Sequence, residues 1–338
     1  MRCFMVPKKI RFGVLGVAKI NDRVFPSFER TQHAELAGIA SRDPQKSEKA
    51  AQLWNIPKHF GSYEDLIADP AIDVIYNPLP NHLHDKYTRL AAEKGKHILC
   101  EKPLCPSAQE SKSLFDYCKA QKVILMDGFM WPHHPRTKKL RDILDSGRLG
   151  KVRRAHGSFT YPMDPLDPDN IRLKPEMGGG GLLDVGCYPI YGIRWAFGEE
   201  PVRAYASAEW KYGVDIEMAG VLEFADGRTA TFDCGFTQPL RMNLEIVCEK
   251  GVVRIPKMWL PEPEASYHIE FSDGGHEQGT LPGMDQIACM LDNMAKKIKG
   301  LPNDVPCGRN AFRTVAVLDA LAKSAVDHRP VEITKWED

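Results

Sequence analysis

Two kinds of segment alternate along the first 125 or so residues. Short apolar runs, typical of buried strands, are separated by segments in which apolar residues recur at helical spacing. This alternation predicts βαβ units and a parallel sheet with helices on both faces. The predicted strands are 10–15, 34–40, 74–76, 97–100 and 123–126, and the predicted helices are roughly 19–30, 44–54, 63–68, 83–95 and 107–120.

The pattern changes after about residue 127. A segment rich in Pro, Asp and Gly covers 161–181, and a short helix is expected near 188–197. Turn-bounded strands follow, and the pair Asp226-Gly227 is typical of a tight hairpin. The expected strands are 202–212, 216–225, 228–237, 242–248, 251–255 and 267–272, and two helices at about 284–299 and 309–326 close the chain.

These patterns predict an α/β protein with two domains. Residues 1–126 are expected to form a domain with a parallel sheet covered by helices, and residues 127–338 are expected to form an α+β domain with a mostly antiparallel sheet. The late helix at about 309–326 is a candidate to pack back on the first domain. The length of 338 residues agrees with about two domains.

Charge and composition exclude several classes of protein. The chain has 45 Lys and Arg against 45 Asp and Glu, so it lacks the basic surplus that nucleic-acid binding requires. No window approaches 18 apolar residues, so no membrane span is expected. The first nine residues lack the apolar core of a signal peptide. The nine cysteines are scattered and form no zinc-type spacing, which favours a reducing, cytoplasmic location and predicts no metal site.

A candidate dinucleotide turn follows the first strand. It reads Gly16-Val17-Ala18-Lys19-Ile20-Asn21, where a full Rossmann fingerprint would place G-x-G-x-x-G/A. Gly16 is kept, Ala18 replaces the second glycine, and Asn21 replaces the third. The segment is equally compatible with a simple strand–turn–helix corner. Its position after the first strand of a βαβ unit would aim a helix N-terminus at a pyrophosphate.

The end of the second strand predicts the form of the cofactor. Ser41 and Arg42 precede Asp43 there, and an arginine binds a 2′-phosphate in bidentate fashion. NADP is therefore the preferred cofactor, with NAD as the alternative. Ser41 or Asp43 also suits the N-cap of the helix that begins with Pro44, and the two roles are compatible.

Three further motifs resemble those of the Gfo/Idh/MocA oxidoreductases. They are Pro80-Asn81-His82-Leu83-His84, Glu101-Lys102-Pro103 and the stretch 178–188, which contains four glycines, Asp184 and Tyr188. With a tyrosine at the last position of the third motif, the chain resembles one branch of this family. That branch contains NADP-dependent xylose dehydrogenases, dimeric dihydrodiol dehydrogenases and 3-ketosugar reductases. The resemblance covers nearly the whole chain. It implies a Rossmann domain followed by a domain built on a large open sheet.

The resemblance also implies a set of site residues. Lys102 and Tyr188 are implied as catalytic, with Asp184 orienting the substrate or Tyr188, and the Lys102–Pro103 bond is often cis in the family. Arg172 is a candidate for substrate oxygens, unless it pairs with Asp167 or Asp169 instead. His84 is equally compatible with a structural hydrogen bond at the start of a helix. The expected cofactor-binding residues are Gly16, Val17, Ala18, Lys19, Ile20, Ser41, Arg42, Pro78, Pro80, Asn81, His84, Glu101, Lys102 and Asp127, and the expected substrate-binding residues are Lys102, Arg172, Asp184 and Tyr188.

The activity that follows is hydride transfer between NAD(P) and a carbinol or ketone carbon of a sugar-like polyol. Tyr188 would exchange the hydroxyl proton, and a nearby Lys102 ammonium would lower its pKa from the ordinary value of about 10. Two alternatives stay open: a dinucleotide-binding regulator without catalysis, and an enzyme that recycles a tightly bound cofactor in glycoside cleavage or sugar–sugar redox exchange. The family further implies a homodimer or homotetramer formed through the open face of the second sheet.

Overall fold

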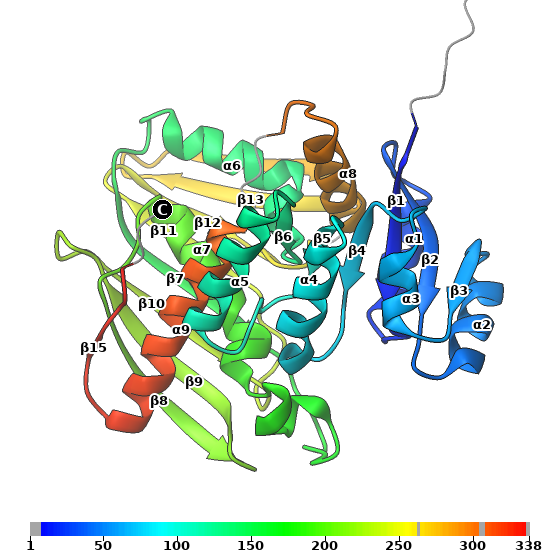
Figure 1. Cartoon of the computed structure of the whole chain (residues 1–338). Coiled ribbons are helices and arrows are strands. Elements are labelled where there is room, and N and C mark those ends of the chain that lie inside the picture. The colour runs from blue at the N-terminus through cyan, green and yellow to red at the C-terminus, as the bar shows by residue number, and fades with distance from the viewer. Residues whose placement is uncertain (1–7, 262–263, 304–307, 336–338) are drawn as a thin grey trace, which may run out of the picture. The chain divides into compact units, whose positions relative to one another are not determined.

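The computed structural model describes residues 8–261, 264–303 and 308–335 (Figure 1). Cys3 and Cys307 lie outside the described residues, and the other seven cysteines are free thiols. The chain folds into two compact units. The first comprises 1–104, 112–134 and 285–309, and the second comprises 105–111, 135–284 and 310–338.

This division differs from the two contiguous domains, 1–126 and 127–338, that the sequence suggests. The chain returns to the first unit through 285–309, which contains helix α8 (Gln286–Ile298). The later helix α9 (Arg309–Asp327), the expected candidate for this return, has all but its first residue in the second unit. The carboxylate of Asp292 accepts hydrogen bonds from the backbone N–H groups of Gln32 and His33, which ties α8 to the start of strand β2.

The first unit is a doubly wound parallel sheet. Its strand order is β3-β2-β1-β4-β5-β6, and every neighbouring pair is parallel. The order reverses between β1 and β4, which is the point where such sheets bind dinucleotides. Its elements are β1 (Ile10–Leu15), α1 (Asn21–Phe28), β2 (Ala34–Ala40), α2 (Pro44–Leu53), β3 (Lys58–Phe60), α3 (Tyr63–Ala68), β4 (Val74–Asn77), the 3₁₀ turn η1 (Asn81–Leu83), α4 (His84–Glu93), β5 (His97–Cys100), most of α5 (Ala108–Ala120), β6 (Leu125–Asp127), η2 (Trp131–His133) and α8.

The second unit is built on a nine-stranded sheet. Its order is β14-β13-β12-β11-β7-β10-β9-β8-β15, and only the central pair β7–β10 is parallel, which confirms the mostly antiparallel prediction. Its elements are α6 (Pro135–Asp145), β7 (Val152–Thr160), η3 (Ile171–Leu173), η4 (Pro175–Met177), the π-helical turn η5 (Leu182–Gly186), α7 (Cys187–Phe197), β8 (Arg203–Lys211), β9 (Val214–Glu223), β10 (Thr229–Gly235), β11 (Leu244–Cys248), β12 (Gly251–Ile255), β13 (Glu264–Phe271), β14 (His276–Pro282), α9 and β15 (Val331–Glu332).

Helix α7 packs on one face of this sheet, against β7, β10 and β11 (Figure 1). The approach to β7 is close because Gly157 has no side chain. A Cβ atom at this position would lie 2.7 Å from the Cβ of Pro189, in the first turn of α7. On the opposite face, which we call the open face, Tyr205 and Val221 are 42% and 39% exposed and lie opposite each other on β8 and β9.

Several elements carry too little apolar signal to be expected from the sequence. Strand β7 is central to the sheet, yet its packing face uses the small residues Ala155 and Gly157, so the hydrophobic pattern does not reveal it. Edge strand β14 alternates half-buried and exposed positions without a strong apolar set, and β3 and β15 are very short. Helix α6 is also absent from the expected elements, although Leu140, Ile143 and Leu144 bury one face of it.

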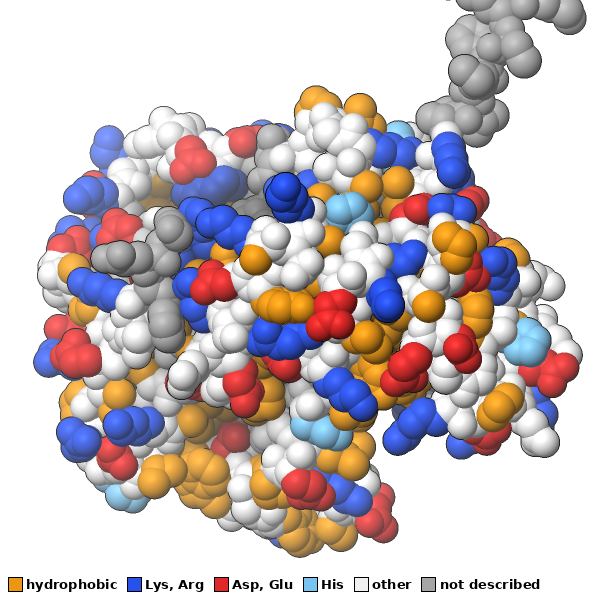
Figure 2. All heavy atoms as spheres, in the orientation of Figure 1, with side chains coloured by type: hydrophobic (Ala, Val, Ile, Leu, Met, Phe, Trp, Pro, Cys, Tyr) orange, Lys and Arg blue, Asp and Glu red, His pale blue; other side chains and the backbone are white. Residues whose placement is uncertain are grey.

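The predicted hairpin turn is present. The Asp226-Gly227 turn joins the antiparallel pair β9–β10, with Gly227 at φ +81°. Acidic and basic side chains are intermixed on the face drawn in Figure 2, in line with the balanced composition. No helix among the described residues combines the length and the apolar character of a membrane span. Within the same residues, no group of three or more His, Cys, Asp or Glu side chains is arranged to hold a metal.

Candidate active site

The turn after β1 is tight and depends on a glycine, as expected of a dinucleotide-binding turn. Gly16 has φ +92°, a region open to glycine, and its N–H donates to the carbonyl of Ala40 at 2.8 Å. Asn21, where the fingerprint has its last small residue, is only 2% exposed, and its side-chain amide donates to the carbonyl of Gly16 at 2.9 Å. Asn21 therefore stabilises the turn through a hydrogen bond, where a small residue would leave space. Val17 is exposed, so the backbone of this turn and the N-terminus of α1 fit the phosphates of a dinucleotide.

Two roles are expected of the side chains at the end of β2: capping helix α2 and binding a 2′-phosphate. Different side chains suit each role. The carboxylate of Asp43 accepts the N–H groups of Gln45 and Lys46 and so caps α2, which confirms the capping prediction. The hydroxyl of Ser41 accepts the N–H of Asp43 at 3.2 Å. Arg42 remains exposed at this strand end. Its guanidinium is the cation that suits a 2′-phosphate.

Tyr63 belongs to the same region and is not expected from the sequence. Its hydroxyl oxygen lies 3.6 Å from the position that a Cβ atom on Gly16 would take. The ring packs edge-to-face on Tyr87 with centroids 5.0 Å apart. Burial raises the pKa of Tyr63, while a hydrogen bond and the charge of Arg42 oppose that shift. Nothing in the sequence marks this tyrosine, because only the fold brings α3 to the turn after β1.

His84, in the loop after β4, has a structural role. It is fully buried; its Nε2 lies 2.7 Å from the carbonyl oxygen of Leu79, and its Nδ1 lies 3.0 and 3.1 Å from those of Pro103 and Leu104. Desolvation lowers the pKa of His84. Both ring nitrogens face main-chain oxygens, so the imidazole links two loops at the carboxyl end of the sheet. Pro78 is buried beside it, and Pro80 and Asn81 are half-buried.

The segment after β5 carries Glu101 and Lys102. The Lys102–Pro103 peptide bond is cis, as the resemblance implied. The carboxylate of Glu101 accepts the hydroxyl of Tyr76 at 2.7 Å and the N–H of Lys102 at 3.3 Å, and desolvation raises its pKa. Asp127 ends β6 and is 6% exposed. The expected cofactor residues thus lie at the carboxyl ends of β1, β2, β4, β5 and β6, which is the ligand-binding edge of a parallel sheet.

In the second unit, Asp184 is the centre of a polar cluster. Its Oδ2 accepts Nε of Arg172 at 2.7 Å and the hydroxyl of Tyr161 at 3.3 Å. The alternative pairing of Arg172 with Asp167 or Asp169 is wrong, because η3 turns the guanidinium toward Asp184. The charge of Asp184 raises the pKa of Arg172, and Tyr188 acts on it in the same sense. Tyr161, like Tyr63 in the first unit, is a residue that the sequence does not reveal.

Tyr188 lies in the first turn of α7 and is 6% exposed. Its ring contacts Phe159 edge-to-face, with centroids 5.1 Å apart, and faces Trp259 with centroids 6.2 Å apart. The indole N–H of Trp259 donates to the carbonyl of Ser158 at 2.8 Å, which fixes that ring. Two aromatic walls therefore restrict Tyr188 to one orientation. The helix begins at Cys187, one residue before the range expected from the sequence, and η5 carries Asp184 just before it.

The glycine run before Asp184 is shaped by a buried carboxylate, that of Asp215 on β9. Gly180 has φ +114°, and a Cβ there would collide with Asp215 Oδ1. The N–H of Leu182 donates to Asp215 Oδ2 at 2.6 Å, and Gly181 contributes a second backbone hydrogen bond. Asp215 is 7% exposed, and burial raises its pKa to about 7. The carboxylate therefore anchors the start of the segment that carries Asp184 and Tyr188.

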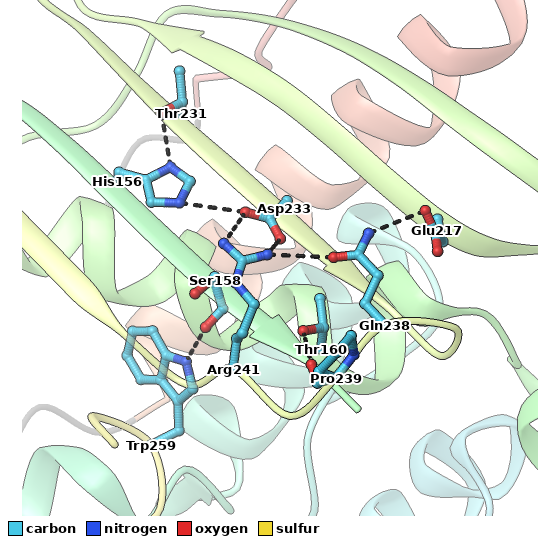
Figure 3. Close-up of polar contacts among 10 residues, drawn as sticks. All are labelled: His156, Ser158, Thr160, Glu217, Thr231, Asp233, Gln238, Pro239, Arg241 and Trp259. Atoms are coloured by element: carbon cyan, nitrogen blue, oxygen red, sulfur yellow. Dashed lines mark hydrogen bonds and ion pairs between the residues drawn. The ribbon is translucent and has the colours of Figure 1, made fainter. Parts of the chain in front are cut away.

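A polar network lies on the open face of the second sheet (Figure 3). Asp233 on β10 binds both Arg241 and His156, and Arg241 reaches Gln238, whose amide donates to Glu217 on β9. These interactions fasten the loop after β10, where Phe236 packs edge-to-face on the ring of Tyr161 at 5.4 Å. The network thus helps to hold the tyrosine that donates to Asp184.

Comparison with known proteins identifies the family of this chain. Residues 10–129 match the model of the oxidoreductase family with an NAD-binding Rossmann fold, and residues 137–254 match the GFO/IDH/MocA C-terminal domain. The chain belongs to the Gfo/Idh/MocA family of oxidoreductases, which confirms the resemblance and the fold class. It is an NAD(P)-dependent oxidoreductase.

Three relatives show where in the family the chain lies. It is 34% identical over 326 residues to D-xylose 1-dehydrogenase (NADP(+)) 2 of Haloferax volcanii, covering 95% of this chain and 99% of that protein. It is 30% identical to dTDP-3,4-didehydro-2,6-dideoxy-alpha-D-glucose 3-reductase of Saccharopolyspora spinosa, covering 94% and 98%. The crystal structure of KijD10, a 3-ketoreductase from Actinomadura kijaniata, in complex with NADP and TDP-benzene, superimposes with a TM-score of 0.84 at 29% identity, covering 94% and 98%.

The raised pKa of Asp215 predicts a pH-dependent stability. A carboxyl whose folded pKa is about 7, against about 4 when unfolded, binds more protons in the native state between these values. The stability that the neutral acid contributes is therefore fully present below about pH 4 and lost as pH rises through about 7. Asp215→Asn keeps the size of the neutral acid but does not titrate. In thermal unfolding from pH 5 to 8, the wild-type Tm should fall relative to that of this variant.

The matched control for this experiment is Asp226→Asn, since Asp226 is an exposed carboxylate in the β9–β10 turn whose pKa is lowered by Arg228. Its difference from wild type should not change over the same pH range. A constant difference between wild type and Asp215→Asn from pH 5 to 8 would contradict the assignment.

Proposed function

We propose that the chain is an NADP-preferring dehydrogenase or reductase that acts on a carbinol or ketone carbon of a sugar or related polyol. The observation that carries the proposal is the Asp184–Arg172–Tyr161 cluster beside the aromatic-walled Tyr188. A cation, a carboxylate and phenolic hydroxyls in one place suit the hydroxyl groups of a polyol. The names of the xylose dehydrogenase and ketosugar reductase relatives support the same substrate class.

The bound nicotinamide supplies the hydride chemistry. The chain's residues bind, orient and move the proton. The Gly16 turn and α1 hold the phosphates, with Ser41 and Arg42 on the 2′-phosphate. Tyr188 takes the hydroxyl proton when a carbinol is oxidised and returns it when a ketone is reduced. Lys102 assists as a fixed positive charge, while Asp184 and Arg172 orient the substrate hydroxyls.

Removal of the Tyr188 hydroxyl tests the proton-transfer role. Tyr188→Phe should lower kcat by about 10²- to 10⁴-fold, the usual range for general acid–base catalysis, and leave the Kd of NADP unchanged. Lys102→Ala should lower kcat at least as much, because it also removes a charge. Turnover is followed by the absorbance of reduced nicotinamide. Tyr191→Phe is the matched control: it removes a hydroxyl from α7 that accepts the amide of Asn310, and kcat should stay at the wild-type value. Full activity in Tyr188→Phe would refute the role.

Cofactor preference tests the strand end after β2. Arg42→Ala should raise the Kd of NADP by about 10- to 100-fold, the worth of a hydrogen bond to a charged group, and leave that of NAD unchanged. Lys49→Ala removes an exposed positive charge from α2 and serves as the control. Fluorescence titration of each reduced cofactor gives both constants. Equal losses for the two cofactors would argue against a 2′-phosphate contact.

A substrate panel separates this function from the two alternatives. Aldoses, inositols and diols are each mixed with NADP⁺ or NAD⁺, and stoichiometric reduction of the cofactor supports the dehydrogenase. Substrate conversion without accumulation of reduced cofactor would indicate a tightly held, recycled dinucleotide. Cofactor binding without any conversion would indicate a regulator.

The open face suits a second copy of this chain. Tyr205 and Val221 form an exposed cross-strand pair there. The family implies a homodimer or homotetramer through this face. Val221→Lys should lower the mass measured by light scattering toward that of a monomer of 38.0 kDa. Leu53→Lys, at a residue 73% exposed on α2, should keep the wild-type mass. An unchanged mass in Val221→Lys would contradict this interface.

A further inference from the structure

A cavity of about 530 Å³ lies in the first unit, at the edge of the parallel sheet opposite the dinucleotide turn. It opens where β1, β4 and β5 begin. Since β1 has six residues at about 3.3 Å each, roughly 20 Å separates this edge from the carboxyl end. The volume is in the usual range for small-ligand sites. The lining residues are Lys8, Lys9, Ile10, Pro70, Ile72, Asp73, Lys94, Gly95, Lys96, His97, Ile298 and Lys299.

The lining is strongly basic. Five lysines come from three separate parts of the first unit, and Asp73 is the one acidic residue among the lining residues. The charge of Asp73 is already balanced, because its carboxylate accepts Nε and Nη2 of Arg11 at 2.9 and 2.7 Å. The cavity therefore has a net positive field that its own acid does not neutralise.

Two of the lysines, Lys96 and Lys299, have buried ammonium groups. Lys96 is 8% exposed, and its Nζ donates to the carbonyls of Asp69 and Ile72, each at 2.7 Å. The Nζ atom of Lys299 is buried and has no hydrogen-bond partner among the described residues. A buried ammonium is costly unless an anion or hydrogen bonds balance it.

Helix ends give a simpler reason for part of this pattern. Lys94 follows α4 and Lys299 follows α8, and lysines are favourable near helix C-termini because of the helix dipole. This effect explains why a lysine stands at each position. It does not explain the position of the Lys299 side chain. A lysine that interacts with the helix dipole directs its Nζ to the terminal carbonyl groups or to water. The Nζ of Lys299 is buried and bonds to no carbonyl group among the described residues.

We propose that this cavity binds a small oxyanion carrying at least two negative charges, of the phosphate or carboxylate type. Lys299 and Lys96 supply fixed ammonium groups at its wall, and Lys8, Lys9 and Lys94 supply the surrounding charge. The site is separate from the cofactor's phosphates, since it lies at the other end of the strands. The inference does not depend on the proposed sugar substrate.

Binding is tested with sodium pyrophosphate and with citrate on the full chain, with NADP present at saturation so that the cofactor's phosphate positions are filled. Calorimetry at constant ionic strength should show one site for each protein chain. Lys299→Met should raise the Kd of the anion by at least about tenfold, as expected for a charged hydrogen bond. The Kd of NADP should stay unchanged.

Controls separate this site from general charge effects and from loss of folding. Lys49→Met removes an exposed lysine outside the cavity and should bind both anions as wild type does. Lys94→Met, at an exposed position, is the second cavity variant if Lys299→Met fails to fold. Without added anion, Lys299→Met should have a higher Tm than wild type, because it removes a buried charge. Equal anion affinity in wild type and the cavity variants, or no binding by wild type, would overturn the proposal.

Discussion

The buried carboxylate of Asp215 determines the shape of the segment that carries Asp184 and Tyr188 in the second unit. It binds the N–H groups at the start of η5, and only glycine at position 180 leaves room for it. From that anchor the chain runs through Asp184 into α7, where Tyr188 occupies the first turn. A shift of this anchor would move the acid and the tyrosine together. Burying a carboxylate costs free energy, as the raised pKa of Asp215 shows. This cost arises at the start of the segment that positions Asp184 and Tyr188.

The two ends of the Rossmann sheet present different chemical groups. At the carboxyl end, backbone turns and the loops joined by His84 form a surface suited to a dinucleotide. At the amino end, lysines from separate parts of the chain gather around a cavity. The first edge is built from tight backbone turns with the exposed Arg42 beside them, and the second from side-chain ammonium groups. Both edges carry groups whose chemistry suits anions.

Much of the fold follows from the order of residues, and the features that do not follow have physical causes. The strands of the first unit are apolar because helices cover both faces, so their pattern is strong and predicts all but the short edge strand β3. Strand β7 escapes prediction because close packing of α7 requires Gly157, and a glycine carries no apolar signal. The chain returns to the first unit through α8 and not through α9, a choice that the sequence leaves open because either amphipathic helix offers the same pattern.

By itself, the sequence determined the family and the alternating architecture, because these depend on local motifs and periodicity. Tertiary structure alone decided which side chains meet. Arg172 pairs with Asp184 and not with its near neighbours, Tyr161 and Tyr63 join their clusters from other elements, and Asn21 closes a turn where a small residue was expected. Contacts between residues far apart in the chain arise from packing, and no local pattern encodes them.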